Sequence, residues 1–462
     1  MTPRKIIIDT DPGQDDAVAI LLALASPEEI DVLGVTCVAG NVPLDLTSKN
    51  ARIVCELAGH RDVKVFAGCD RPLGRDLVTA EHVHGKTGLD GPDLPDPTMP
   101  LAEGHGVDFI IEQLRAHPAG SVTLCPLGPL TNIATALQKA PDIAEKVQEI
   151  VLMGGGYFEG GNITPTAEFN IYVDPHAADI VFKSGIPIVV IPLDVTHKAL
   201  VTKPRNDAFR AIGTPVGVAV AEMTDFFERF DKEKYGSEGA PLHDPCVTAY
   251  LINPDLFKGR HINVEIETVS ELTMGMTVAD WWGVTDRAPN ALFVGDLDAD
   301  GFFALLKKKA GPSMSAHLTL GAPEHLDKLV GLVTAFHAEA GIEMTDEQRR
   351  NGLAPLLEGI PHGAAYLIGP PRAPIGYVVI CFGWSVEFGG LDAIIDEIYV
   401  RPGVRGRGIA SEALIALPRA LAAGGLRAIH LEVDRTNKAA LKVYTRAGFR
   451  PREDYMLMSR KL

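Results

Sequence analysis

A cluster of four aspartates within eight residues near the start of the chain constrains its fold most. The four are Asp9, Asp11, Asp15 and Asp16. The β-branched residues 6–8 predict a buried strand, Pro12-Gly13 ends it, and the apolar spacing of residues 17–24 predicts a packed helix. The aspartates therefore fall at a strand-to-helix junction, and open α/β sheets bind their ligands outside the carboxyl ends of strands.

Such clustered carboxylates repel one another, and a helix N-terminus offsets only about 0.3–1 kcal/mol for each. A bound cation is the simplest remedy. Oxygen ligands without a neighbouring histidine or cysteine favour Ca²⁺, or less readily Mg²⁺, over zinc. The alternative is a solvated acidic turn in which Asp15 or Asp16 caps the helix, and the cost of unpaired clustered charge weighs against it.

The pattern that follows alternates apolar strands with helices. Strands are expected at 30–37, 63–66, 121–125, 150–153 and 186–191, and helices near 45–58, 105–116, 131–139 and 175–184. This order predicts a mostly parallel sheet with helices on both faces, whose polar and glycine-rich loops meet at one rim. Residues 89–100, rich in Pro, Gly and Asp, are expected to form a surface loop.

The motif from Asp9 to Asp16 resembles the N-terminal signature of the inosine-uridine nucleoside hydrolases, which cleave the N-glycosidic bond of ribonucleosides with a Ca²⁺-held water. The resemblance implies an open, mostly parallel, Rossmann-like α/β sheet. Asp-x-Asp also begins the phosphatase loop of haloacid-dehalogenase enzymes. Pro12-Gly13 and the later His243-Asp244 element favour the hydrolase.

The resemblance also implies a set of site residues. The calcium ligands would be Asp11, Asp16, Asp244 and the main-chain carbonyl of Leu127. The substrate-binding residues would be Asp15, Asn41, His84, Met153, Asn162, Glu168 and Asn170. Among these, Asp15 and Asn170 would hold the 2′ and 3′ hydroxyls, Asn162 and Glu168 the 5′ end, and His84 the base.

The same resemblance makes Asp11 the general base and His243 the acid that protonates the departing base. His82 fits a surface residue as well as a pocket residue. The aromatic side chains of residues 225–235 could close over a nucleobase, although aromatics at helical spacing more often belong to a core.

A second unit is expected after a charged run into Gly311-Pro312, which predicts a helix end and a linker. Residues 1–312 hold 44 Asp and Glu against 26 Lys and Arg, whereas residues 313–462 hold 16 against 17. Such asymmetry indicates two units with different ligands. In the second, strands are expected at 316–320, 364–368, 375–382 and 393–400, and a helix at 323–340.

Glycines between arginines follow the last of these strands, and such a strand-to-helix turn can hold a pyrophosphate. With residues 431–433 and 437–449, it resembles the acyl-coenzyme A signature of the GNAT N-acetyltransferases. This implies an α+β domain over residues 313–462 that binds acetyl-CoA. The residues holding coenzyme A would be Val400, Arg405, Gly406, Arg407, Gly408, Ile409, Ala410 and, at its pantetheine, Asn437. Tyr444 would protonate the leaving thiolate, and Asp396 or Glu397 would deprotonate the amine acceptor or lie at the surface.

Composition limits the remaining classes of function. The net charge of −17 argues against a nucleic-acid partner. The strand close to the start leaves no room for a signal peptide, and no apolar run reaches a membrane span, so a cytoplasmic location is expected. Six scattered cysteines predict no disulfide. We therefore expect a bifunctional enzyme, which the resemblance implies is a dimer or tetramer. The alternative is that one unit is catalytic and the other a ligand-binding regulatory module.

Overall fold

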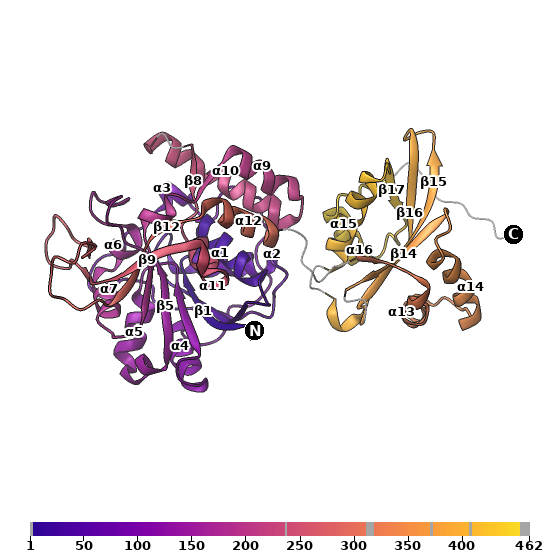
Figure 1. The fold of residues 1–462 in the computed structure, drawn as a ribbon. Coiled ribbons are helices and arrows are strands. Elements are labelled where there is room, and N and C mark those ends of the chain that lie inside the picture. Colours follow the sequence, from indigo (N-terminus) through magenta and orange to yellow (C-terminus); the bar gives the residue numbers. More distant parts are fainter. Residues whose placement is uncertain (1–2, 236–237, 311–317, 370–372, 406–408, 453–462) are drawn as a thin grey trace. The chain divides into compact units, whose positions relative to one another are not determined.

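The computed structural model describes residues 3–235, 238–310, 318–369, 373–405 and 409–452, and the chain separates into two compact units, Met1–Gly311 and Pro312–Leu462 (Figure 1). The predicted linker residues 311 and 312 lie outside the described residues. Among the described residues, no helix combines the length and apolar character of a membrane span.

An eight-stranded sheet forms the centre of the first unit, in the order β3-β2-β1-β4-β5-β6-β12-β9. The strands are β1 (Arg4–Thr10), β2 (Ile30–Cys37), β3 (Val65–Ala67), β4 (Val122–Pro126), β5 (Val147–Met153), β6 (Ile188–Ile191), β9 (Phe257–Ile262) and β12 (Ala291–Leu297). Neighbouring strands are parallel except β12 and β9, which are antiparallel. The predicted mostly parallel sheet is confirmed.

Helices cover both faces of this sheet. They are α1 (Gln14–Leu24), α2 (Leu44–Leu57), α4 (Gly106–Ala116), α5 (Thr131–Lys139), α7 (Pro175–Phe182), α9 (Lys203–Ile212), α10 (Pro215–Tyr235), α11 (Pro245–Ile252) and α12 (Ala299–Ala310), with the short α3 (Glu81–His84), α6 (Phe169–Val173) and α8 (Leu193–Thr196). Ile6 and Ile8 of β1 belong to the core under α1 and α11, whereas Ile7 belongs to the core under α4 and α5. This alternation follows from the two-residue repeat of a strand.

Two small hairpins complete the first unit. β7 (Leu200–Thr202) pairs with β8 (Gly239–Pro241), and β10 (Val264–Ile266) pairs with β11 (Thr277–Ala279), both antiparallel. Residues 89–100, the expected surface loop, contain no helix or strand.

The second unit is built on a five-stranded sheet in the order β13-β14-β15-β16-β17, antiparallel except for the parallel pair β16 and β17. Its elements are β13 (Leu318–Leu320), α13 (Leu326–Ala340), α14 (Asp346–Leu357), β14 (Gly363–Ile368), β15 (Gly376–Ser385), β16 (Gly390–Val400), α15 (Ile409–Ala423), β17 (Ala428–Leu431) and α16 (Lys438–Arg446). One core packs under α13 and α14 and another under α15. The α+β fold class is confirmed.

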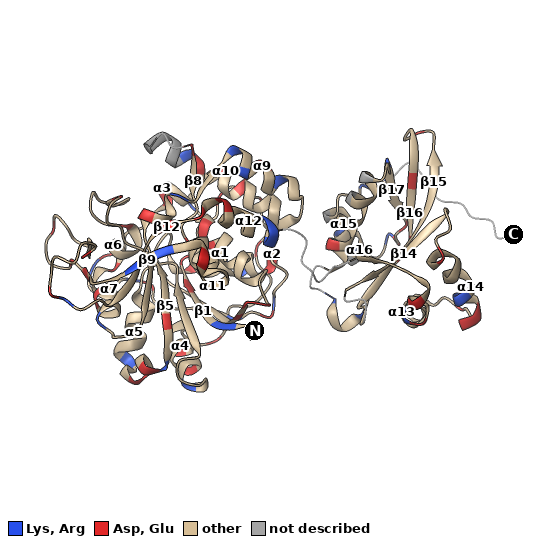
Figure 2. Cartoon of the chain, in the orientation of Figure 1, with Lys and Arg blue, Asp and Glu red and all other residues tan. Residues whose placement is uncertain are grey.

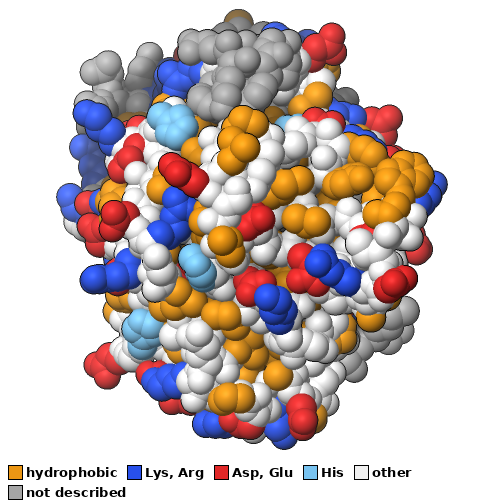
Figure 3. Space-filling model, turned by 90° about the vertical axis from the view of Figure 1, so that its left-hand side faces the viewer, with side chains coloured by type: hydrophobic (Ala, Val, Ile, Leu, Met, Phe, Trp, Pro, Cys, Tyr) orange, Lys and Arg blue, Asp and Glu red, His pale blue; other side chains and the backbone are white. Residues whose placement is uncertain are grey.

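Charged side chains of both signs are interspersed over the chain (Figure 2) and over the face of the molecule drawn in Figure 3. Lysines and arginines on that face stand beside acidic and hydrophobic side chains. The described part of this face therefore has no extended basic patch of the kind that binds a phosphate backbone.

Candidate active site

The acidic cluster forms where β1 leads into α1. Relative exposures of 0% for Asp11, 5% for Asp15 and 1% for Asp16 show that these carboxyl groups are buried. Asp244, which is 3% exposed, joins them from the residue before α11. α11 is tied to α1 by a hydrogen bond from Thr248 Oγ1 to the Ala19 carbonyl, 3.2 Å long. One carboxylate oxygen each of Asp15, Asp16 and Asp244 lies within 4.8 Å of the others.

Hydrogen bonds fix two of these carboxylates. Asp16 accepts from Thr10 Oγ1, from the Gly13 N–H at 3.0 Å and from Asn41 Nδ2 at 3.2 Å. Asp11 Oδ2 accepts from the Asn41 N–H at 2.7 Å. Asp11 Oδ1 is buried and has no hydrogen-bond partner among the described residues. A buried carboxylate oxygen without a donor is costly, so this atom calls for a ligand.

Burial and mutual repulsion raise the pKa of these acids. Burial is the largest cause for Asp11, Asp16 and Asp244, and neighbouring carboxylates add to it for Asp11 and Asp244. A divalent cation would reverse the effect by favouring the ionised forms. The donor set, all oxygen, fits Ca²⁺.

The first of the four aspartates is held apart from this group. Asp9 Oδ1 accepts hydrogen bonds from Thr36 Oγ1 at 2.5 Å and from Asn132 Nδ2 at 2.7 Å. Burial raises the pKa of Asp9 to about 7 despite these bonds.

Two glycines allow the backbone to approach Asp11. A Cβ atom added at Gly40 would lie 2.1 Å from Asp11 Oδ2, and one added at Gly128 would lie 2.1 Å from Asp11 Oδ1. Any side chain at either position would displace the carboxylate. The neighbouring carbonyl of Leu127 accepts from Asn170 Nδ2 at 2.7 Å and keeps a second lone pair, so it can still serve as a ligand.

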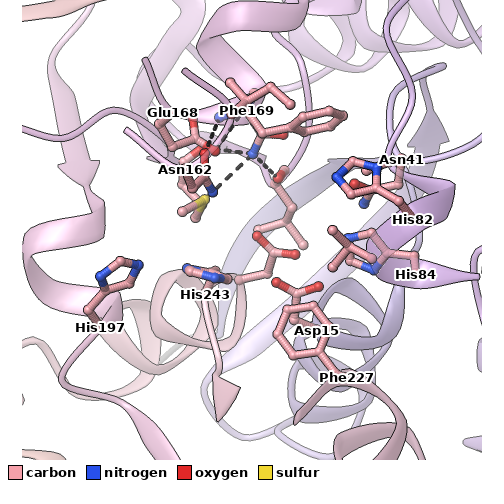
Figure 4. A pocket seen from close by; sticks show the side chains of 17 residues that line it. Asp15, Asn41, His82, His84, Asn162, Glu168, Phe169, His197, Phe227 and His243 are labelled. Carbon is pink, nitrogen blue, oxygen red and sulfur yellow. Dashed lines mark hydrogen bonds between the residues drawn. The ribbon is translucent and has the colours of Figure 1, made fainter. Parts of the chain in front are cut away.

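A pocket of about 730 Å³, counting the open solvent at its mouth, lies beside these carboxylates (Figure 4). Its lining includes every residue that sequence analysis assigned to substrate binding: Asp15, Asn41, His84, Met153, Asn162, Glu168 and Asn170. Leu127, His243 and Asp244 line it as well, whereas Asp11 and Asp16 do not.

One side of the pocket carries both donors and acceptors. Glu168 caps α6 and accepts hydrogen bonds from the N–H groups of Asn170 at 3.0 Å, Gly155 at 3.1 Å and Ile171 at 3.3 Å. Burial still raises the pKa of Glu168 to about 7. Asn162 accepts from the Phe169 N–H at 2.9 Å. This mixture of fixed polar groups suits a ligand rich in hydroxyls.

The other side is formed by histidines and one phenylalanine. Phe227, in α10, stacks on His84 with ring centroids 5.5 Å apart and meets His243 edge-on at 6.3 Å. His243 Nδ1 lies 2.7 Å from Thr196 Oγ1. Burial, with His197 and His84 nearby, lowers the pKa of His243 well below its usual value. Aromatic rings of this kind can pack against a planar ring of a ligand.

Several pocket residues differ from the sequence-based expectation. His82 lines the pocket, and of the aromatic segment 225–235 Phe227 does so, while the side chains of residues 230–235 are not described. His197 and Ile163 were not predicted. His197 binds Glu159 at 3.1 Å and lies 5.8 Å from the His243 ring. It follows the short α8, and no motif in the sequence marks it.

In the second unit, most of the predicted coenzyme A residues follow the end of β16 in sequence, and Asn437 stands at the start of α16 (Lys438–Arg446). Val400 ends the strand, and its carbonyl accepts from Arg405 Nε at 2.7 Å. Ile409 and Ala410 begin α15, and Asn437 caps α16 by accepting from the Ala440 N–H at 3.0 Å. Gly406, Arg407 and Gly408 lie outside the described residues.

The proposed acid and base of this unit differ in environment. Tyr444, on α16, packs against Phe449 at 6.3 Å, and burial raises its pKa. Asp396 is exposed, whereas Glu397 accepts from Tyr377 at 2.6 Å and lies 2.8 Å from His337 Nε2. Glu397 is therefore held by two partners in this structure.

Comparison with known proteins gives a consistent result for each unit. Residues 6–304 match the model of the inosine-uridine preferring nucleoside hydrolase family, and residues 332–449 match that of the acetyltransferase (GNAT) family. An uncharacterized protein of Schizosaccharomyces pombe is 52% identical over 307 residues, which cover 66% of this chain and 99% of that protein. A pyrimidine-specific ribonucleoside hydrolase of Citrobacter koseri is 47% identical over 305 residues, which cover 66% and 97%.

A solved structure supports the same assignment. The purine-preferring ribonucleoside hydrolase from Gardnerella vaginalis superposes with a TM-score of 0.62 at 34% identity, covering 66% of this chain and 98% of that one. The similarity extends over the first unit.

Proposed function

The chain belongs to the inosine-uridine preferring nucleoside hydrolase family, and we propose that its first unit uses Ca²⁺ to hydrolyse the N-glycosidic bond of ribonucleosides to ribose and free base. One observation carries this proposal. Buried oxygens of Asp15, Asp16 and Asp244 converge beside a pocket, next to the unpartnered Oδ1 of Asp11. Four buried acids can all be ionised only if a cation offsets their repulsion, and the pocket leaves room for a sugar beside it.

Asp11, Asp16, Asp244 and the Leu127 carbonyl would hold the ion. When bound, Ca²⁺ would orient a water and the ribose diol together. Asp11 would accept the proton of the attacking water, the role that the family resemblance implies for it. The carboxylate oxygens within 4.8 Å of one another are those of Asp15, Asp16 and Asp244, so this group includes Asp15 and does not include Asp11. We keep Asp15 as a residue that binds the ribose hydroxyls beside the ion.

Polar groups on the wall of the pocket hold the sugar. Asn170 faces the 2′ and 3′ hydroxyls with Asp15, and Asn162 and Glu168 hold the 5′ end. Cleavage leaves positive charge on the ribose, and the carboxylates around it stabilise that charge.

His243 assists the departing base. If the Thr196 hydroxyl donates to Nδ1, Nε2 carries the proton, and this N–H can donate to the base as negative charge develops there. This hydrogen bond stabilises the departing anion, and the proton that the free base finally takes up comes from water, because a neutral imidazole donates a hydrogen bond without giving up its N–H proton.

A nucleoside panel tests this proposal. Ribose release is measured for uridine, cytidine, inosine and adenosine, with the full chain first treated with a chelator and then resupplied with Ca²⁺. We expect cleavage of at least one nucleoside, its loss on chelation and its recovery with Ca²⁺. Cleavage that persists unchanged in excess chelator would contradict calcium dependence, and cleavage of none would contradict the activity.

For the second unit we propose acetyl transfer from acetyl-CoA to an amine. The match to the GNAT family and the placement of Val400, Asn437 and Tyr444 support it. Thioester consumption with candidate amines, for wild type and Tyr444→Phe, is the test. If no amine is acetylated although acetyl-CoA binds, the alternative holds, and this unit is a ligand-binding regulatory module.

A further inference from the structure

One buried glutamine, Gln14, has no role in the proposed hydrolysis. Gln14, the first residue of α1, is 1% exposed and lies between two of the acidic residues of the cluster in sequence. Its side chain turns toward His84 instead. Gln14 Oε1 lies 2.7 Å from His84 Nδ1, and Nε2 donates to the carbonyls of His84 at 3.0 Å and Asp90 at 2.9 Å.

These three contacts determine the amide orientation of Gln14. In the opposite orientation, Oε1 would face two carbonyl oxygens, and neither contact could be a hydrogen bond. Oε1 therefore faces His84 Nδ1. Because an amide oxygen only accepts, Nδ1 must carry a proton.

The second ring nitrogen of His84 opens on the pocket. His84 is 7% exposed and lines the pocket, and no described residue bonds its Nε2. Nε2 is not a buried atom without a partner, which leaves it accessible from the pocket. Burial lowers the pKa of His84 to about 3, which keeps the ring neutral and leaves a lone pair on Nε2.

The surrounding packing holds the ring in this position. A Cβ atom added at Gly13 would lie 2.4 Å from His84 Nδ1, so the backbone before α1 closely contacts the ring edge. Phe227 stacks on its face at 5.5 Å. The imidazole therefore cannot rotate freely to exchange its two nitrogens.

We propose that Gln14 is a positioning residue that fixes His84 as a hydrogen-bond acceptor for an N–H group of the nucleobase, so that His84 recognises the base and does not protonate it. The inference deepens the proposed function and rests on it for the identity of the ligand. The two pocket histidines then have different roles: His84 accepts a hydrogen bond from the base, and His243 donates one to it.

The first test observes the tautomer and needs no substrate. Nitrogen-15 spectra of histidine-labelled full chain, with His84 identified by its loss in His84→Gln, report which ring nitrogen carries the proton. We expect the Nδ1–H form in the wild type at neutral pH, and a shift toward Nε2–H in Gln14→Leu. A wild-type His84 in the Nε2–H form would overturn the proposal.

The second test uses uridine and N3-methyluridine, which lacks the N3–H donor. We expect the wild type to favour uridine by about tenfold or more in kcat/KM, the usual effect of one hydrogen bond. If the pocket merely excludes the methyl group, the ratio of kcat/KM for uridine to that for N3-methyluridine should stay the same in Gln14→Leu. If His84 causes the preference, this ratio should fall toward one. Gln113→Leu, on α4 outside the pocket lining, is the matched control and should keep the wild-type ratio.

The outcomes distinguish the inference from the function on which it rests. Equal cleavage of both nucleosides by the wild type, or an unchanged ratio in a folded Gln14→Leu, overturns the role of His84 while nucleoside hydrolysis stands. If the wild type cleaves neither nucleoside, nor any other in the panel, the proposed function fails, and the tautomer measurement still decides the role of Gln14.

Discussion

The two units place their reactive groups in opposite ways. In the first unit, Asp15, Asp16 and Asp244 are no more than 5% exposed, and one carboxylate oxygen of each lies within 4.8 Å of the others. In the second, the surface of Asp396 is exposed, although partial burial and the neighbouring Glu397 raise its pKa, and Arg405 pairs with Glu339 at 2.6 Å. Carboxylates that are buried together need a cation to remain ionised, whereas a single acid at the surface keeps its contact with water.

This difference indicates that the acidic site of the first unit is preorganised before its ligands bind. A pyrophosphate can be held by backbone N–H groups at a helix start, which need no buried charge. Glycosidic cleavage must stabilise opposite charges a few ångströms apart, and this requires groups fixed before the substrate arrives.

The largest expected effect comes from breaking the buried cluster. Asp244→Asn should lower nucleoside cleavage by about 10³-fold, because several kcal/mol of charge stabilisation depend on the ion that it holds. Acetyl transfer by the same protein should be unchanged. Ribose release and thioester consumption measured on one sample check both statements.

The exposed Asp255 offers a matched control, since Asp255→Asn changes the same charge on the same unit. If Asp244→Asn and Asp255→Asn behave alike, the buried cluster is not the catalytic centre.

The next effect concerns the leaving group. His243→Gln should lower kcat for nucleosides by about 10²-fold, the usual contribution of a positioned acid. With a nitrophenyl riboside, whose leaving group needs no proton, the substitution should lower kcat much less. The exposed His261 provides the control variant His261→Gln. An equal loss for both substrates would remove His243 from that role.

A smaller effect tests the close packing around Asp11. Gly128→Ala should lower activity by roughly tenfold to a hundredfold, as displacement of a ligand does, because the new methyl would meet Asp11 Oδ1. Gly331→Ala, in α13 of the second unit, meets no atom within 4 Å and should be silent in hydrolysis. A Gly128→Ala enzyme with wild-type kcat/KM would show that Asp11 can move without cost.

The smallest effect is on stability and concerns Glu168. Its pKa rises from 4.5 to about 7 on folding, so the folded chain keeps a proton that the unfolded chain has lost. The stabilisation is complete below about pH 4.5 and is lost as pH rises toward about 7. Glu168→Gln should remove the contribution of Glu168 to the slope and leave that of Asp9, whose pKa is also raised to about 7. Thermal midpoints of unfolding, measured across that pH range at fixed calcium, report this pH dependence, and Glu112→Gln at an exposed position is the control. Parallel curves for the wild type and Glu168→Gln would contradict the prediction.

Much of this picture follows from the sequence alone. The β-branched residues 6–8, followed by Pro12-Gly13, predict a strand and then a helix at the aspartates. The alternation of strands and helices predicts the parallel sheet. In the second unit the sequence predicts β13, β14, β15 and β16 with shifted ends, but it does not predict β17 or α14. Charged residues and Pro355 interrupt the apolar spacing of α14.

The site was less predictable in its contacts than in its residues. Motifs named Asn170, Glu168 and His84, but nothing local in the sequence shows that Gln14 turns away from the acids toward His84. His197 reaches the pocket because α8 follows β6 at the rim, and this is a property of the tertiary fold. Contacts between distant segments are decided by packing, which spacing alone does not encode.

Calorimetric titration of Ca²⁺ into the metal-free full chain tests the central claim most directly. The account predicts one tight site in the wild type that Asp244→Asn abolishes and Asp255→Asn leaves intact. An absence of calcium binding, or binding that Asp244→Asn does not weaken, would contradict it.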